Sequence, residues 1–387
     1  MTDVLDEAAR RLESEEFASQ PKLRADLEQI IARSYAFQGK YDLANKHLQK
    51  YVVLQTRLYG ENDPKTLAAL AFSADLLLSK GELAEAEKLY RRVLPLMRNE
   101  QRRGTLKVDT LVAALNNFGY LRRTQGDSKE AESLFRETLA FSREMPNESH
   151  YFIGLTRSTL ASTLADQGKF EEALQTAREA VAEYRQRGQI DAPDFGFALT
   201  ILGGFLTEKG EFAAADANLR DAETIFRRRL NPLHLWLGDN LRNQAILLYQ
   251  QENYKEALSK ADETLNIYRE SFGKHYDHYP TALMIRGLSL TQTGQPKEGE
   301  GVLREAVRIR KESLPQGHYW TALANSALGE CLTIQRRFDE AERLLRESFE
   351  ELKISQGEQN PKTLLARRRL GKLYQKWNKP ELPSKHR

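Results

Sequence analysis

A chain of 387 residues is long enough for two or three globular domains at about 150 residues each. Only 23 residues are glycine and 12 are proline, while 40% are hydrophobic and 29% are charged, which excludes collagen-like, loop-rich and disordered chains. The 58 Lys and Arg against 55 Asp and Glu leave a formal charge of +3, so no overall field attracts nucleic acid or an anionic membrane.

Cysteine content and hydropathy narrow the class further. The single cysteine, Cys331, excludes an intrachain disulfide and a zinc site built on paired cysteines. No stretch approaches the roughly 20 consecutive apolar residues of a membrane span, and the first residues do not have the pattern of a secretory signal. We therefore expect a helix-rich cytoplasmic protein without a membrane partner.

In chain order, the first predicted element is an amphipathic helix at 2–17. Its apolar stripe is Val4, Leu5, Ala8 and Leu12. We assign 1–20 to a leading helix that caps one end of the structure, because the residues after it repeat and a repetitive stack has an exposed end to cover.

From residue 21 to residue 378 the chain is repetitive. A position held mostly by glycine recurs every 42 residues, with a single interval of 45 between Gly81 and Gly126. The nine positions are Gly39, Gly81, Gly126, Gly168, Gly210, Glu252, Gly294, Arg336 and Asn378. Glycine there adopts the left-handed conformation that lets a second helix double back on the first.

Two further positions of the repeat hold small residues. Seven residues before the turn stand Ala32, Ala74, Gly119, Ala161, Gly203, Ala245, Gly287, Gly329 and Gly371. Five residues after it stand Ala44, Ala86, Ala131, Ala173, Ala215, Ala257, Gly299 and Ala341. Since a glycine inside a helix costs about 1 kcal/mol relative to alanine, a regular series of them indicates close contact between helices.

Each period therefore predicts two antiparallel helices. Asp63-Pro64 and Asn360-Pro361 place a capping side chain before a first-turn proline, which is typical of a helix start. The count gives eight helix pairs followed by a single closing helix at 361–377. A short basic tail occupies 379–387.

The small residue, turn glycine, large apolar residue and alanine at these offsets resemble the tetratricopeptide repeat, usually 34 residues long. The 42-residue unit and the phrase Gly-Glu-Asn-Asp-Pro-Lys-Thr-Leu at 60–67 resemble the kinesin light chain subgroup. A weaker resemblance is to repeat regions downstream of bacterial serine/threonine kinases. The resemblance implies an all-α, right-handed superhelical solenoid whose first helices line a concave groove for a protein or peptide.

The repeat register predicts which side chains point into that groove. The predicted groove residues are Arg33, Asn116, Tyr120, Arg123, Arg242, Tyr249, Gln250 and Arg368. Asn116, Tyr120 and Arg123 form the leading cluster, and Arg242, Tyr249 and Gln250 form the second, because tyrosine and arginine are frequent interface anchors. The alternative is that these side chains are solvated residues of a helix surface.

We interpret the chain as a non-catalytic adaptor that binds a protein or peptide, because phosphate-binding loops, zinc-protease motifs and nucleophile elbows are absent. No cofactor or metal is expected. Two alternatives stay open: a ligand-sensing regulatory module of a bacterial signalling protein, and local nucleic-acid contact through Arg227–Arg229 or Arg367–Arg369. Nucleic acid is not the expected partner, and a homo-oligomer stays open.

Overall fold

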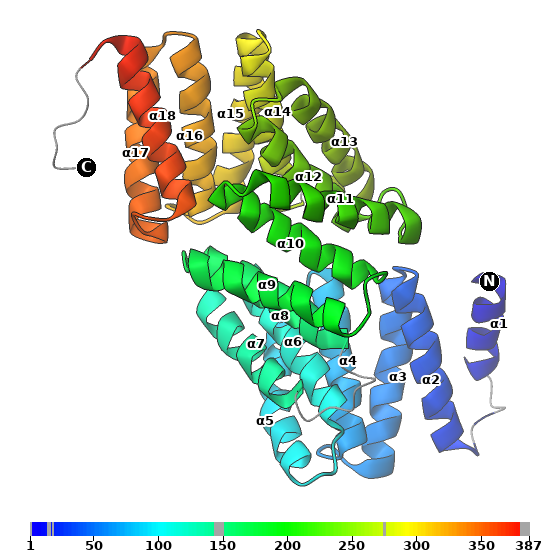
Figure 1. Cartoon of the computed structure of the whole chain (residues 1–387). Coiled ribbons are helices and arrows are strands. Elements are labelled where there is room, and N and C mark those ends of the chain that lie inside the picture. Colours follow the sequence, from blue (N-terminus) through cyan, green and yellow to red (C-terminus); the bar gives the residue numbers. More distant parts are fainter. Residues whose placement is uncertain (1, 14–16, 18, 143–150, 274–275, 380–387) are drawn as a thin grey trace. The chain divides into compact units, whose positions relative to one another are not determined.

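The computed structural model describes residues 2–13, 17, 19–142, 151–273 and 276–379. In these residues it contains 18 α-helices and no strand (Figure 1). The helices are α1 Thr2–Glu13, α2 Pro21–Phe37, α3 Tyr41–Tyr59, α4 Pro64–Lys80, α5 Leu83–Arg102, α6 Val108–Thr124, α7 Ser128–Ser142, α8 Tyr151–Asp166, α9 Phe170–Gln186, α10 Pro193–Lys209, α11 Phe212–Arg229, α12 Leu235–Gln250, α13 Tyr254–Phe272, α14 Tyr279–Gln292, α15 Pro296–Ser313, α16 Tyr319–Ile334, α17 Phe338–Gln356 and α18 Pro361–Trp377. The predicted all-α class is confirmed, with eight pairs from α2 to α17, the leading α1 and the closing α18.

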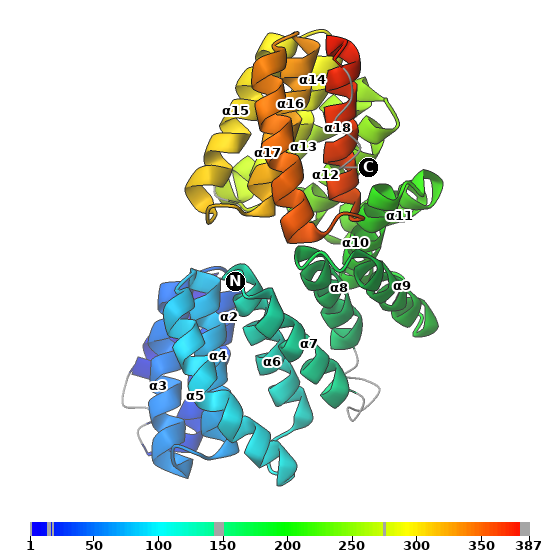
Figure 2. The same cartoon turned by 90° about the vertical axis from the view of Figure 1, so that its left-hand side faces the viewer.

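The chain divides into two compact units, which we describe separately. Unit 1 comprises residues 1–156 and holds α1 to α7 with the first turns of α8. Unit 2 comprises residues 157–387 and holds the rest of α8 through α18. In each unit, successive helices pack side by side in chain order (Figures 1 and 2).

Helix starts follow the predicted capping chemistry. The Asp63 carboxylate accepts a hydrogen bond from the Lys65 backbone N–H at 2.9 Å, and the Asn360 side chain does the same for Lys362 at 3.0 Å. His234 caps α12 with its ring Nδ1, which accepts from the Trp236 backbone N–H at 3.1 Å. Sequence patterns do not reveal this last cap, since histidine is not among the usual N-cap residues.

The turn between paired helices is left-handed even where glycine is missing. Gly81 and Gly210 have φ of 82° and 89°. Glu252, Arg336 and Asn378, predicted to take the same place, have φ of 63°, 60° and 55° and are the described non-glycine residues with positive φ. The position within the repeat thus determines this conformation. Repeats that have another residue in place of glycine adopt it at a steric cost of about 1–2 kcal/mol per residue.

That cost predicts that Arg336→Gly stabilises unit 2. Arg336 is exposed, so its substitution removes little packing, and relief of the left-handed strain raises the free energy of unfolding by about 1 kcal/mol. Urea unfolding measures the change. Gly210→Ala is the control: nothing lies within 4 Å of its Cβ, so its expected loss comes from backbone conformation alone. A destabilised Arg336→Gly protein would show that the strain argument is wrong.

The small-residue positions lie where paired helices touch, as predicted. A Cβ added to Gly203 would lie 2.6 Å from Leu219 Cγ, and one added to Gly329 would lie 2.6 Å from Leu345 Cγ. The alanines five residues after each turn are fully buried: Ala44, Ala86, Ala131, Ala173, Ala215, Ala257 and Ala341. At Gly371 nothing lies within 4 Å, since among the described residues no helix follows α18.

The predicted apolar stripe of the leading helix faces α2 but is only partly buried. Leu12 and Ala9 are buried, whereas Val4 is 75% exposed and Ala8 is also exposed. The stripe is exposed in part because an open pocket separates it from α2, to which α1 is tied by the Tyr35 hydroxyl donating to the Asp6 carboxylate at 2.7 Å. Residues 14–16 of the predicted helix, and 380–387 of the predicted tail, lie outside the described residues.

Candidate binding surface

In unit 2 the first helices of the pairs line an inner face. The Tyr249 hydroxyl on α12 donates to the Glu330 carboxylate on α16 at 2.9 Å, although the whole α14–α15 pair lies between them in the chain. A contact that skips a repeat forms only on the inner side of a curved stack. The orientation that the family resemblance implies, with first helices inside, therefore holds for this unit.

Polar side chains of this inner face are already bonded to one another. The Gln292 amide donates to Tyr249 at 3.3 Å and to Glu330 at 3.4 Å, and Arg369 Nε donates to the other Glu330 oxygen at 2.5 Å. Burial, followed by the Glu330 charge, raises the pKa of Tyr249 above its usual value. Tyr249 is therefore a neutral hydrogen-bond donor within a network, which we call the inner-face network: Tyr249, Gln292, Glu330 and Arg369.

The second predicted cluster is divided between two environments. Tyr249 belongs to the inner-face network, whereas Arg242 lies beside Asp239, with 3.7 Å between Arg242 Nε and a carboxylate oxygen. Asp239 also accepts hydrogen bonds from the Tyr268 and Tyr276 hydroxyls at 2.7 and 2.9 Å. Gln250 is half-buried at the end of α12. Tyr249 and Arg242 thus make contacts inside the fold.

Arg368 and its neighbour Arg369 have opposite environments. Arg368, the predicted groove residue, is exposed, while Arg369 is 7% exposed and bonded to Glu330 and to the Ser326 hydroxyl. Arg369, Tyr319 and Lys362 are inner-face residues that sequence reasoning missed. Nothing in a single sequence distinguishes Arg369 in the run Arg367–Arg369, because the packing of α18 against α16 decides which of the three is covered.

The first helices of unit 1 also contact one another in order. The Arg33 guanidinium lies over the Phe72 ring at 5.2 Å, joining α2 to α4. The Asn117 amide donates to the Asp75 carboxylate at 2.9 Å, joining α6 to α4. Asn116, a predicted groove residue, accepts from the Thr156 hydroxyl at 3.0 Å and so contributes to packing.

Large side chains stand exposed on these same helices. Phe37, two residues before its turn, is 95% exposed, and Tyr120, six residues before its turn, is 51% exposed. Arg33, at the same repeat position as Tyr120, is exposed, and Arg123 is half-buried one turn along α6 from Tyr120. We call Arg33, Phe37, Tyr120 and Arg123 the first-helix face of unit 1.

Asp75 lies within this face but is tied to the core. Its carboxylate accepts from Asn117 and from the Tyr90 hydroxyl. Burial is the largest effect on this carboxyl and raises its pKa, although both hydrogen bonds act in the opposite direction. Asp75 is therefore a structural carboxyl in a site that disfavours its charge.

The raised pKa predicts that Asp75→Asn stabilises unit 1 at neutral pH. A carboxyl whose pKa is higher in the folded state contributes stability below its unfolded pKa and loses that contribution as the pH rises through the folded value. The carboxamide of the variant keeps an acceptor without the charge, so its advantage should be larger at pH 7 than at pH 4. Thermal melts at both pH values measure it, and a pH-independent difference would contradict the assignment.

The first of the two arginine runs that suggested nucleic-acid contact is paired with carboxylates, as is Arg369 of the second, while Arg367 and Arg368 are exposed. Arg227 bonds Glu263 at 2.8 Å, and Arg228 and Arg229 both contact the Asp191 carboxylate. Arg369 is buried against Glu330. Neighbouring carboxylates therefore neutralise much of the charge that a phosphate backbone would need.

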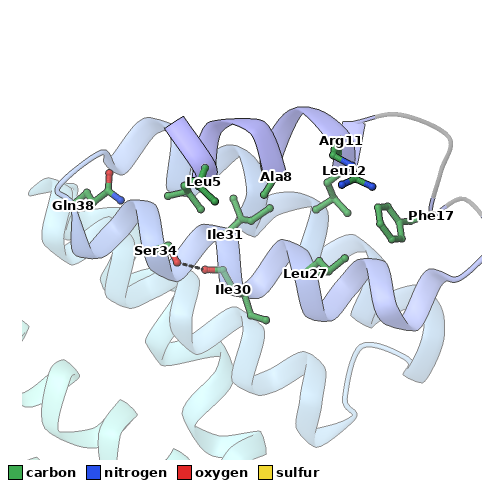
Figure 3. A pocket seen from close by; sticks show the side chains of 11 residues that line it. Leu5, Ala8, Arg11, Leu12, Phe17, Leu27, Ile30, Ile31, Ser34 and Gln38 are labelled. Carbon is green, nitrogen blue, oxygen red and sulfur yellow. Dashed lines mark hydrogen bonds between the residues drawn. The ribbon is translucent and has the colours of Figure 1, made fainter. Parts of the chain in front are cut away.

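An apolar pocket of about 450 Å³ lies between α1 and α2 (Figure 3). Leu5, Ala8 and Leu12 of α1 face Leu27 and Ile31 of α2 across it. The pocket lies beside the first helix pair, where α1 leaves part of the apolar face of α2 uncovered.

Among the described helices none is long and apolar enough to cross a membrane. The described residues also contain no group of three His, Cys, Asp or Glu side chains that could hold a metal ion.

Comparison with known proteins identifies the repeats. The tetratricopeptide repeat family model matches residues 23–99, 110–186, 196–270, 241–312 and 320–382. The chain therefore belongs to the tetratricopeptide repeat family, whose members are commonly protein-interaction scaffolds. None of the curated proteins compared with this sequence matches it.

Solved structures with a similar fold differ strongly in sequence. A Rap protein complexed with competence and sporulation factor is 13% identical, with a TM-score of 0.57 over 92% of this chain and 99% of that one. The STAND protein PH0952 from Pyrococcus horikoshii is 13% identical, with a TM-score of 0.53 over 88% of this chain and 50% of that one. Kinesin light chain repeats from Podosopora anserina are 16% identical, with a TM-score of 0.38 over 52% of this chain and 95% of that one. At these identities the Rap and STAND structures show a likeness of fold alone.

Proposed function

We propose that the protein is a non-catalytic adaptor that binds a peptide segment of a partner protein on the first-helix face of unit 1. One observation supports this most: Phe37 and Tyr120 are large aromatic side chains that stand in water on helices whose other aromatic side chains are largely covered. Exposed aromatic and arginine side chains at regular spacing suit a peptide that gains from several modest contacts.

The chemistry of this face favours a particular peptide. Phe37 and Tyr120 offer apolar surface, while the Arg33 and Arg123 guanidinium groups favour carboxylates. The ligand is therefore a segment with apolar side chains and at least one acidic residue. The Rap protein of similar fold was solved in complex with competence and sporulation factor, which is consistent with a fold that holds a ligand.

The test compares Tyr120→Ala/Arg123→Ala with wild type. Affinity capture from the native lysate with mass spectrometry identifies the partner, and calorimetry with its purified segment gives the affinity. We expect the double variant to bind at least about tenfold more weakly, because aromatic and arginine anchors carry most interface energy. Its melting temperature should fall by only a few degrees, since Tyr120 is half exposed.

Val53→Ala provides the control. Val53 is 56% exposed on α3, a second helix, so its loss should leave binding unchanged. If Tyr120→Ala/Arg123→Ala bound with wild-type affinity, the first-helix face of unit 1 would not be the binding surface. Equal weakening by Val53→Ala would show that the effect is not specific to the first helices.

A ligand-sensing regulatory module is the second candidate function. One observation in unit 2 favours it: the inner-face network joins first helices of different pairs. A ligand that binds on this face would have to break these hydrogen bonds, so its binding would change how the helices are held together. Nucleic-acid contact gains no such support, since Arg227, Arg228 and Arg229 face carboxylates.

A further inference from the structure

The last repeats of unit 2 contact its first repeats directly. The Tyr319 hydroxyl on α16 donates to the Asp166 carboxylate on α8 at 2.8 Å, across 153 residues of chain. Lys362 Nζ on α18 lies 2.7 Å from the Glu208 carboxylate on α10. Both views place the turn between α17 and α18 beside the start of α9 and the end of α10 (Figures 1 and 2).

The turn itself adds two weaker hydrogen bonds. The Gln356 amide donates to the Asp166 backbone carbonyl at 3.4 Å, and the Asn360 amide donates to the Gly168 carbonyl at 3.5 Å. A Cβ on Gly168 would lie 2.7 Å from the Gln356 carbonyl oxygen, so the two turns approach at backbone distance. We call this contact the clasp; its members are Asp166, Gly168, Glu208, Tyr319, Gln356, Asn360 and Lys362.

Donors and acceptors are segregated across the clasp. Asp166, Gly168 and Glu208 supply only acceptors, from two carboxylates and two backbone carbonyls. The facing groups are donors: a hydroxyl, two amides and an ammonium. Each of these hydrogen bonds replaces bonds to water and therefore stabilises the closed form only modestly. The Lys362–Glu208 attraction is also weakened by salt.

The clasp controls whether a ligand can reach the inner face of unit 2. Hydrogen bonds that join first and last repeats hold the first helices of unit 2 around the inner-face network. A peptide that runs along this face must separate the two turns and replace the network's own bonds. The acceptor side of the clasp would then be free to bind donors on that peptide.

We propose that the clasp is a reversible latch that holds unit 2 closed, and that an extended peptide rich in lysine and amide side chains opens it by taking the acceptors of Asp166 and Glu208. The latch is an autoinhibitory contact, because segment 356–362 occupies the place of such a ligand. It is independent of the first-helix face of unit 1.

The experiment measures opening in the full chain by the distance between two spin labels. Gln175→Cys on α9 and Glu350→Cys on α17 carry the labels in a Cys331→Ser background, and both labelled positions are exposed. Tyr319→Phe/Lys362→Met removes the two short clasp bonds. We expect its open fraction to rise by about tenfold for each bond removed, with longer inter-label distances. High salt should open wild type in the same direction.

Lys372→Met/Tyr374→Phe is the matched control, because both residues lie on α18 outside the clasp and Tyr374 bonds Glu342 instead. Circular dichroism checks that all variants remain helical. Unchanged distances in Tyr319→Phe/Lys362→Met at low and high salt, or equal opening of the control, would overturn the latch.

A synthetic peptide with the sequence of residues 354–364 is the ligand probe. It should shift wild type toward the open distances, whereas the same peptide with Lys362→Glu should not. Opening by both peptides, or by neither, would overturn the assignment of the ligand. None of these readouts involves the first-helix face of unit 1, so failure of the latch and failure of the proposed function are distinguishable.

Discussion

Gly299→Ala is expected to lower the free energy of unfolding of unit 2 by about 3 kcal/mol, because overpacking of a helix contact typically costs about 1–3 kcal/mol and a clash with backbone lies near the upper end. The added Cβ would lie 2.5 Å from the Gly287 carbonyl oxygen and 2.5 Å from Thr291 Oγ1. Real Cβ atoms do not approach that closely. A backbone oxygen inside α14 cannot move aside without shifting its helix.

Gly301→Ala is the control in the same helix. Gly301 is exposed, nothing lies within 4 Å of its added Cβ, and alanine is favoured over glycine in a helix interior by about 1 kcal/mol. The same chemical change two residues away should therefore stabilise the protein. Urea unfolding of both variants measures the two changes in the free energy of unfolding. Equal effects of the two substitutions would show that helix propensity, not the contact between α14 and α15, governs Gly299.

Arg369→Met is expected to destabilise unit 2 by about 3–5 kcal/mol, because removal of one partner from a buried ion pair leaves the other charge desolvated and unpaired. Arg369 is buried, and its loss leaves the Glu330 carboxylate in the inner-face network without its cation. Adding Glu330→Gln should recover part of the loss, since a neutral amide can still accept from Tyr249.

Arg368→Met tests the neighbouring arginine. Arg368 is exposed, and substitutions at such surface positions usually change stability by less than about 0.5 kcal/mol. Denaturant unfolding of both single variants and of Arg369→Met/Glu330→Gln completes the comparison. Similar stability of the Arg368→Met and Arg369→Met proteins would contradict the assignment of Arg369 to the inner face.

The contrast between these two arginines shows where sequence reasoning ends for the site. The repeat register selects Arg368 by its distance from the turn, yet the buried residue is the next one. Residue type and register point to Tyr249, but not to the bond between its hydroxyl and Glu330, two repeats away. Partners so far apart in the chain meet through the accumulated curvature of the stack, which no local pattern encodes.

The repeat period was sufficient for the fold because each of its signals is local. A left-handed turn, a capping side chain before a first-turn proline and a small residue at a helix contact all act within one or two adjacent helices. Even Glu252 and Arg336, which lack the usual glycine, follow the register into the left-handed turn. The pairs, their order and the position of α18 as the last described helix follow from counting these signals.

Tertiary structure alone decided the role of each first-helix side chain. The amino-acid sequence predicts that the polar residues of α8, α10, α12, α16 and α18 lie on first helices. It does not predict which of these residues contact one another. Asp166 meets Tyr319 and Glu208 meets Lys362 because small rotations between successive pairs add up over several repeats. Contacts between distant repeats depend on the geometry of many packed interfaces together, whereas each helix pair depends only on its own turn. Helix pairing can therefore be predicted from the amino-acid sequence, and the distant contacts cannot.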